Sequence, residues 1–147
     1  KVEGTFSIEN LGPNNNQNVV FGVSLAGGKI TFPDSKVITR EFTRQREYIA
    51  GYGTWNPWDD RCLITGMSAG TNLDGKTFAL TITSPLEWTA ACRFLVTGTI
   101  GFDVEGIEPF VLDYGTGECD ALATLSRGDE TREITLRYWH PKYQGNQ

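Results

Sequence analysis

The sequence of 147 residues contains one histidine, one methionine and three cysteines. The histidine, His140, lies beside Pro141 in a polar end segment, and no serine or cysteine nucleophile motif accompanies it. Carboxylate pairs such as Asp59 and Asp60 are common in loops, so they do not by themselves indicate a hydrolytic centre. The sequence therefore predicts a protein that is not an enzyme.

Positive charge is also scarce, with 13 Lys and Arg against 18 Asp and Glu and a formal net charge of −5. Nucleic acids and anionic membranes attract an excess of positive charge, so neither is an expected partner. No apolar run approaches the roughly 20 residues that span a bilayer. The chain begins at Lys1 without a basic and apolar leader, so we expect a mature or excised segment.

Alternation of apolar and polar residues is the strongest local pattern that is present. Residues 76–84, 93–104 and 132–138 carry an apolar side chain at every second position. Such a period requires a strand with one buried and one solvent-facing side. Residues 2–9 and 19–25 repeat the pattern, and no stretch has sustained helical spacing.

Turn residues separate these runs. Gly27-Gly28 and residues 72–75, 115–117 and 127–129 combine glycine with small polar residues, and glycine readily takes the positive φ of a tight hairpin. Strands joined by short turns pair antiparallel. We therefore predict a single all-β domain over residues 1–147, with roughly nine to eleven strands in an antiparallel β-sandwich or an extended β-meander.

An irregular loop at residues 52–61 contains Tyr52, Trp55 and Trp58. Flat aromatic side chains on a β scaffold stack on sugar rings or anchor a protein partner. Large aromatic residues in a loop also close the open end of a sandwich. Both interpretations are open at this stage, and only the first makes these three residues a ligand or partner site.

The acidic residues Asp113, Glu118 and Asp120 surround two glycines in a short segment. Calcium prefers several carboxylate and carbonyl oxygens on a tight loop, so these three residues are a candidate metal site, although the spacing is not that of an EF-hand. The alternative is a glycine-rich hairpin whose aspartates cap the turn. Apart from this possible calcium site, the sequence predicts no cofactor.

Arg40, Arg44 and Arg46 alternate around Phe42 in a predicted strand. One interpretation is a stripe that binds an anion. The other is a solvent-exposed face on which the arginines pair with carboxylates of neighbouring strands.

The three cysteines cannot all pair within one chain. Cys92 and Cys119 lie at the ends of predicted strands, where a bridge would join one strand start to the next hairpin, and Cys62 would then be a small buried side chain. Three free thiols in a cytosolic protein fit the cysteine count equally well.

The second half of the sequence resembles a group of uncharacterised surface lipoproteins and exported proteins of Bacteroidetes-type bacteria. The resemblance covers about residues 40–136. It is carried by Asn56-Pro57-Trp58-Asp59-Asp60, Ile64-Thr65-Gly66, Asp74-Gly75-Lys76-Thr77-Phe78, Ser84-Pro85-Leu86, Cys92-Arg93-Phe94 and Asp113-Tyr114-Gly115-Thr116-Gly117-Glu118-Cys119-Asp120.

The resemblance implies export, a β-rich fold and a place at the cell surface, but no activity. It also favours the Cys92–Cys119 bridge, because both positions match and exported proteins meet oxidising conditions. Cys62 is a departure from the family pattern. The first forty residues are not covered, and no lipid-anchoring cysteine is visible at the start of the chain.

These observations lead to two hypotheses for function. In the first, the chain is a non-catalytic extracellular or cell-surface structural or adhesive protein that self-assembles through strand edges or termini, or binds other surface proteins. In the second, it is a carbohydrate-binding module that uses Trp55 and Trp58. Assembly through the C-terminal end predicts that Trp139 and Tyr143 are buried, in this domain or in another subunit.

Overall fold

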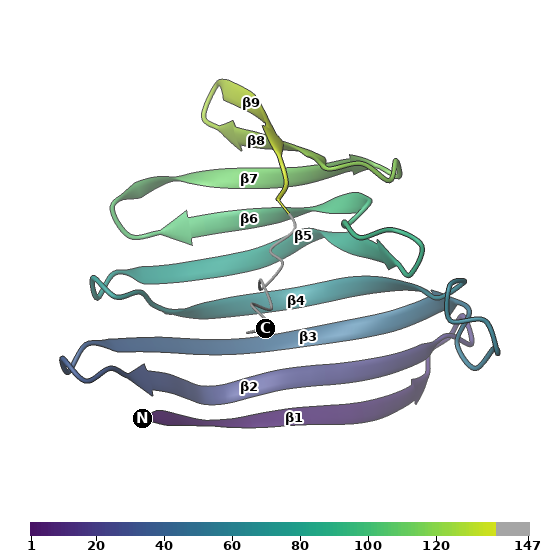
Figure 1. Cartoon of the computed structure of the whole chain (residues 1–147), viewed down its shortest axis with the longest axis horizontal. Coiled ribbons are helices and arrows are strands. Elements are labelled where there is room, and N and C mark those ends of the chain that lie inside the picture. The colour runs from purple at the N-terminus through teal and green to yellow at the C-terminus, as the bar shows by residue number, and fades with distance from the viewer. Residues whose placement is uncertain (138–147) are drawn as a thin grey trace, which may run out of the picture.

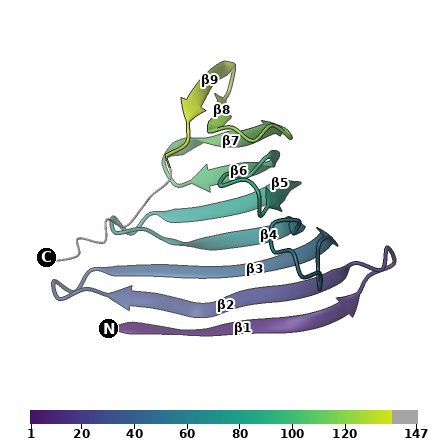
Figure 2. The same ribbon diagram turned by 45° about the vertical axis from the view of Figure 1, so that its right-hand side comes forward.

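The computed structural model describes residues 1–137, which form nine β-strands and no helix, so none of them belongs to a helix that could cross a membrane. The strands form one antiparallel sheet in chain order (Figures 1 and 2). The all-β prediction is confirmed, and the architecture is the extended meander. The strands are β1 (Val2–Pro13), β2 (Val19–Thr31), β3 (Val37–Ala50), β4 (Arg61–Thr71), β5 (Thr77–Thr89), β6 (Thr97–Val104), β7 (Ile107–Thr116), β8 (Leu122–Arg127) and β9 (Glu130–Thr135).

Short turns produce this order. Between β4 and β5 the amide of Gly75 donates to the Asn72 carbonyl oxygen at 3.0 Å, and the Asn72 side chain accepts from the Asp74 amide at 3.0 Å. Gly128-Asp129 is the whole connection between β8 and β9. Turns of this length leave the next strand no partner except its predecessor, so the sheet grows by one strand at a time.

The hairpin predicted at Gly27-Gly28 is wrong, because β2 runs through both glycines from Val19 to Thr31. The pairing with β3 shifts between Leu25 and Gly28, which marks a β-bulge. Gly27 takes a φ of 61°, and a Cβ on Gly28 would collide with the Arg40 carbonyl oxygen. A bulge uses the same conformational freedom of glycine as a tight turn, so the local sequence does not separate the two.

The strand predicted over residues 93–104 begins later than expected, at Thr97. Residues 90–96 instead connect β5 to β6. The Cys92 amide donates to the Thr89 carbonyl oxygen at 3.1 Å, and the Val96 amide donates to Glu87 at 3.0 Å. Apolar and polar residues continue to alternate through this connection, but its backbone amides bond to the end of β5 instead of extending β6.

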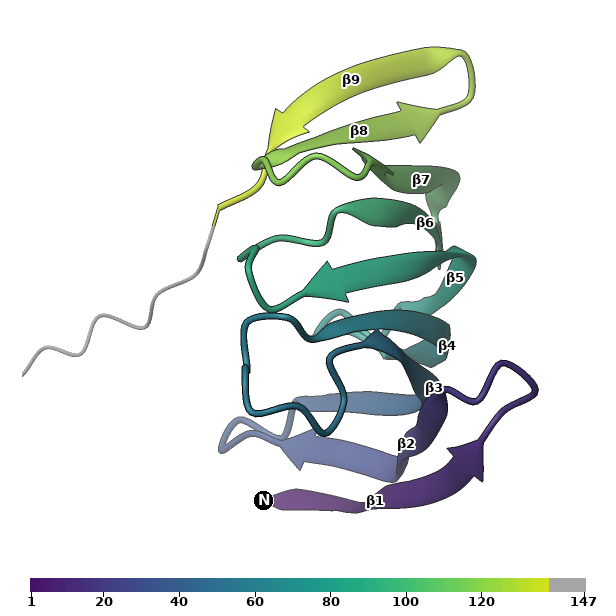
Figure 3. The same cartoon turned by 90° about the vertical axis from the view of Figure 1, so that its right-hand side faces the viewer.

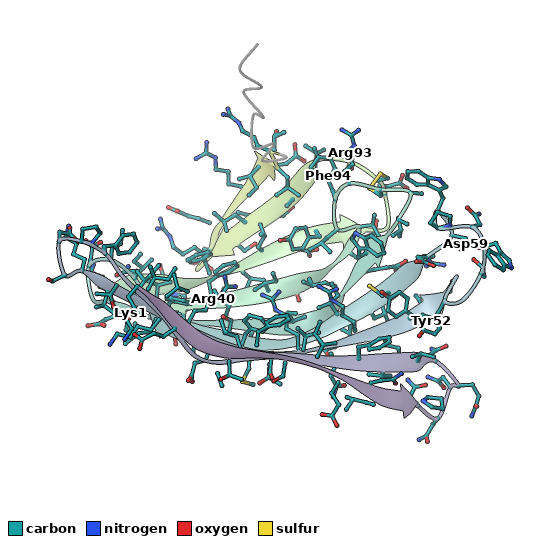
Figure 4. The ribbon with its side chains drawn as sticks, turned by 60° about the horizontal axis from the view of Figure 1, so that its bottom comes forward. Lys1, Arg40, Tyr52, Asp59, Arg93 and Phe94 are labelled. Atoms are coloured by element: carbon teal, nitrogen blue, oxygen red, sulfur yellow. A yellow bond between two sulfur atoms is a disulfide. The ribbon has the colours of Figure 1, made fainter. Side chains whose placement is uncertain are left out.

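Register shifts also interrupt the pairing of β1 with β2, β3 with β4, β4 with β5, β5 with β6 and β6 with β7. A bulge bends its strand and increases its twist. The sheet is accordingly curved into an open trough with a concave inner face and a convex outer face (Figures 3 and 4). Figure 4 shows Arg40 and Tyr52 on the inner side of this trough.

The two faces differ in chemistry, as the alternation predicts. Paired residues on neighbouring strands share a face. One row on the inner face is mainly apolar, and comprises Phe6, Leu25, Phe42, Ser68, Leu80, Phe102, Phe110 and Arg127. The adjacent row on the outer face is small and mainly polar, and comprises Ser7, Ser24, Thr43, Met67, Thr81, Gly101, Val111, Ser126 and Thr131.

The hydrophobic core is thin. None of the large side chains in residues 1–137 is fully buried, because the described chain forms one sheet without a second layer. The buried apolar residues are Val20, Val23, Cys62, Leu86, Cys92, Val96 and Ala123. Domains normally bury an apolar sheet face against another layer, and within residues 1–137 the inner face of the trough has none.

Candidate functional site

Strand β3 carries Arg40, Arg44 and Arg46 on the inner face of the trough; we call these three residues the arginine row. Their partners on β2 are Gly28, Val23 and Phe21, respectively. On β4 they lie opposite Gly70, Gly66 and Ile64. Two of the three β4 partners are glycines, and at both a Cβ would collide with the β3 backbone, so the two strands approach closely there.

Two members of the arginine row, Arg40 and Arg44, contact the aromatic ring of Phe42. The Arg44 guanidinium carbon lies 4.9 Å from the centre of the Phe42 ring, and that of Arg40 lies 5.8 Å from it. Attraction between cations and the ring face stabilises this arrangement. The Nε of Arg40 also donates a hydrogen bond to the Ser68 hydroxyl at 3.2 Å.

No carboxylate in the described part of the chain forms an ion pair with the arginine row. Burial lowers the pKa of the Arg44 guanidinium, and the charges of Arg40 and Arg46 lower it further. Arginine nevertheless stays protonated in proteins. Arg40 and Arg46 are solvent-exposed, as predicted, and Arg44 is half-buried. The predicted pairing with carboxylates of neighbouring strands is wrong, because no such ion pair forms within residues 1–137.

The sequence also indicates which face of the sheet carries the arginine row. Arg40, Arg44 and Arg46 have the same parity as Ile38, Phe42 and Tyr48, so they must share a face with these apolar side chains.

An open hollow of about 650 Å³ lies at the end of the trough where Val2 and the β4–β5 turn meet; we call it the end hollow. Its apolar walls include Leu25, Ile30, Ile38 and Phe78. Arg40 lines it too, so the hollow continues into the arginine row. Figure 4 shows Lys1 and Arg40 at this end of the trough.

The irregular loop that contains Tyr52, Trp55 and Trp58 connects β3 to β4 at the other end of the trough; we call it the aromatic loop. The Tyr52 ring is 5.1 Å from the Tyr48 ring and 6.0 Å from the Phe21 ring, so it extends the apolar inner face. Trp55 and Trp58 are 103% and 71% exposed, respectively. Closure of a sandwich end is therefore the wrong interpretation for the two tryptophans.

Hydrogen bonds within the aromatic loop fix its path. The Thr54 hydroxyl donates to Asp59 at 2.9 Å, and the Asn56 side chain accepts from the Trp58 amide at 3.2 Å. The loop thus presents Trp55 and Trp58 to solvent on an internally bonded support, as a stacking surface requires.

Cys92 and Cys119 form a disulfide bond, as the sequence resemblance implies, with 5.7 Å between their Cα atoms. Cys62 is free and buried, in agreement with its predicted role as a small apolar side chain. Burial raises the pKa of its thiol, so Cys62 is a poor nucleophile.

The candidate calcium ligands lie around one hollow that Asp113, Glu118 and Asp120 all line. Asp113 accepts from the Gly115 amide at 2.8 Å, and Asp120 accepts from the Leu122 amide at 3.0 Å. Both aspartates therefore cap turns. No group of three His, Cys, Asp or Glu side chains within residues 1–137 is arranged to hold a metal ion.

His140, Trp139 and Tyr143 lie outside the described residues. In comparisons with known proteins, the chain matches no protein-family model, no curated protein and no solved structure. The resemblance to exported proteins of Bacteroidetes-type bacteria stays a prediction.

Proposed function

We propose that the chain is a non-catalytic structural subunit of the cell surface or extracellular space, and that it assembles with further copies of itself through the free edge of β1. The observation that carries this proposal is the outer edge of β1, which has no strand beside it in the described chain and presents large apolar side chains.

The exposure of β1 is unusual for an edge strand. Val2, Phe6 and Ile8 are 79%, 60% and 64% exposed, respectively. Residues 5–10 pair with β2 without a bulge, so their outer backbone groups form a regular row. Proteins normally protect such an edge with charge, proline, bulges or a short strand. Here the bulges lie on either side of the regular stretch.

Pairing of β1 with β1 of a second copy explains this exposure best. Two identical edges related by a two-fold axis pair antiparallel and close as a dimer. The inner faces of the two troughs would then be continuous across the junction, and Phe6 and Ile8 would gain apolar neighbours. β9 is a poorer partner for β1, because Glu130, Arg132 and Glu133 make that edge charged.

The disulfide supports the extracellular location. Reducing compartments keep cysteines as thiols, whereas secreted and surface proteins retain disulfide bonds. Cys92 and Cys119 are bonded while Cys62 is buried and free, a distribution that suits an exported chain.

Sedimentation velocity over a range of protein concentrations tests the assembly. The wild-type chain is expected to form dimers as the concentration rises. Ile8→Lys puts a charge on the β1 edge and should weaken association roughly tenfold or more, because the lysine would be buried without a counter-charge. Thr131→Lys makes the same charge change on β9 and should leave association unchanged. A wild-type monomer at every concentration, or equal effects of the two variants, contradicts the proposal.

A second candidate function is carbohydrate binding by the aromatic loop, which the exposure of Trp55 and Trp58 favours. A glycan array would identify a ligand. Loss of that binding in the Trp55→Ala, Trp58→Ala double variant, with retention in Met67→Ala on the outer face, would support it. Unchanged binding in the double variant would remove the tryptophans from the glycan site.

A further inference from the structure

The apolar end hollow and the positively charged arginine row are joined on the inner face of the trough, and Arg40 belongs to both. We infer that this combined surface binds a long-chain alkyl carboxylate, with the alkyl chain in the end hollow and the carboxylate on Arg40 and Arg44. The arginines of this site lie on β3, but its apolar wall includes Val2 of β1, the strand that the proposed assembly uses, so the experiments below test the two separately.

The charge of the site selects the ligand's headgroup. Arg40, Arg44 and Arg46 repel one another, and no carboxylate in residues 1–137 balances them. A bound anion relieves that repulsion. A guanidinium group also matches a carboxylate with two parallel hydrogen bonds. Phe42 holds the guanidinium groups of Arg40 and Arg44 in position before any ligand binds, which reduces the entropy lost on binding.

The apolar walls select the rest of the ligand. Leu25, Ile30, Ile38 and Phe78 present hydrocarbon to a hollow whose volume of about 650 Å³ lies within the range of sites for small molecules. An inorganic anion would leave these walls in contact with water. An alkyl chain removes them from water and gains the hydrophobic free energy of that burial.

The charges along the trough set the ligand's direction. Glu3, Lys29 and Asp74 line the hollow, and the side-chain ammonium group of Lys1 lies 2.8 Å from a Glu3 carboxylate oxygen, so opposite charges balance there. The arginine row has no ion-pair partner within residues 1–137, so it attracts a ligand carboxylate more strongly than the hollow does. The headgroup therefore points along the trough towards Arg44, and the alkyl chain extends back into the hollow.

Competition against a fluorescent dansyl-labelled undecanoic acid tests the inference. Decanoate should displace the probe from the wild-type chain at a much lower concentration than decanol or decyltrimethylammonium, which share its chain length but not its charge. Equal displacement by all three amphiphiles would overturn the role of the arginines. Equal displacement by decanoate and inorganic sulfate would overturn the role of the alkyl chain, and absence of probe binding would overturn the site.

Matched variants locate the ligand. Arg40→Gln and Arg44→Gln should each weaken decanoate binding roughly tenfold or more, because each removes a charged hydrogen-bond donor. Arg127→Gln makes the same change at an arginine paired with Glu130 at 3.3 Å and should bind decanoate as the wild type does. Ile30→Glu in the end hollow should abolish binding, whereas Met67→Glu on the outer face should not.

The same titrations on Ile8→Lys separate this inference from the proposed assembly. Decanoate binding that persists in a monomeric Ile8→Lys chain would support an independent site. Loss of binding in this variant, with wild-type binding intact, would show that the site requires the assembly and would contradict its independence.

Discussion

The first five strands and the last four are stabilised in different ways. Strands β1 to β5 contain 11 to 14 residues each, whereas β6 to β9 contain 6 to 10. We call these the long half and the short half. The long half has extended pairing and ends in the apolar edge of β1. The short half ends in a charged edge, and the Cys92–Cys119 bridge ties the β5–β6 connection to the β7–β8 connection.

The difference shows two solutions to the same physical problem. A single sheet buries too little apolar surface to offset the conformational entropy of its strands. In the short half a covalent bond reduces the entropy of the unfolded chain, and the stacked rings of Phe102 and Phe110, 4.6 Å apart, cover part of the inner face. The long half lacks a crosslink, and its edge and inner face are the surfaces that we propose a second copy and a ligand cover.

The largest expected effect comes from breaking the crosslink. The two cysteines are 27 residues apart, and closing a loop of this length stabilises a protein by about 3.5 kcal/mol in the chain-entropy estimate. Cys92→Ala with Cys119→Ala should lower the free energy of unfolding by about that amount, measured by urea denaturation. Hydrogen exchange should show lost protection first in β6 to β9.

Cys62→Ala is the control for the loss of a buried sulfur without loss of a crosslink, and we expect it to reduce stability by about 1 kcal/mol. Equal effects of the two changes would contradict the role of the bridge. Earlier loss of protection in β1 to β4 would contradict the difference between the halves.

A smaller loss of stability is expected from a substitution at the β-bulge of β4 in the long half. Gly66 in β4 takes a φ of 135°, and a Cβ there would collide with the carbonyl oxygen of Thr43. Gly66→Ala should destabilise the protein by about 2 kcal/mol through this overpacking, measured by urea denaturation. Gly53→Ala is the matched control, since Gly53 has a φ of 80° and open space around it, so only the backbone strain of about 1 kcal/mol applies. Equal losses in both variants would mean that the bulge has room to adjust.

The residues themselves were sufficient to predict the all-β class and the antiparallel pairing of neighbouring strands. Alternation at residues 76–84 and turn residues such as Asn72 and Gly75 depend on neighbours in the chain, so they can be read locally. The bridge between Cys92 and Cys119 was predictable only with the help of a resemblance, because their separation alone leaves other pairings open.

The curvature of the sheet and the end hollow could not be predicted from the sequence. A glycine pair such as Gly27-Gly28 serves a hairpin or a bulge equally well, and only pairing with β3 decides between them. The end hollow forms where residues as distant as Val2 and Phe78 meet across the strands. The face that carries the arginine row could be predicted, because its residues and Phe42 are an even number of positions apart in one strand. The absence of a carboxylate partner could not be predicted, because it depends on which residues of β2 and β4 lie beside the row.

The smallest expected effect concerns a polar contact of the long half. Glu47 accepts hydrogen bonds from the side-chain nitrogens of Asn14 at 2.8 Å and Asn18 at 2.7 Å, and these bonds lower the pKa of its carboxyl group. A carboxyl whose pKa is lower in the folded state stabilises the protein above its unfolded pKa of about 4.3, and this contribution is lost as the pH falls through the folded pKa. Glu47→Gln should therefore reduce stability by about 1 kcal/mol at pH 7 and by less in acid, measured by urea denaturation at both pH values.

The matched control is Glu133→Gln, an exposed change in β9 of the short half, which should alter stability at pH 7 by less than about 0.5 kcal/mol. A loss for Glu47→Gln that is the same at both pH values would show that the side chain acts through packing rather than through its charge.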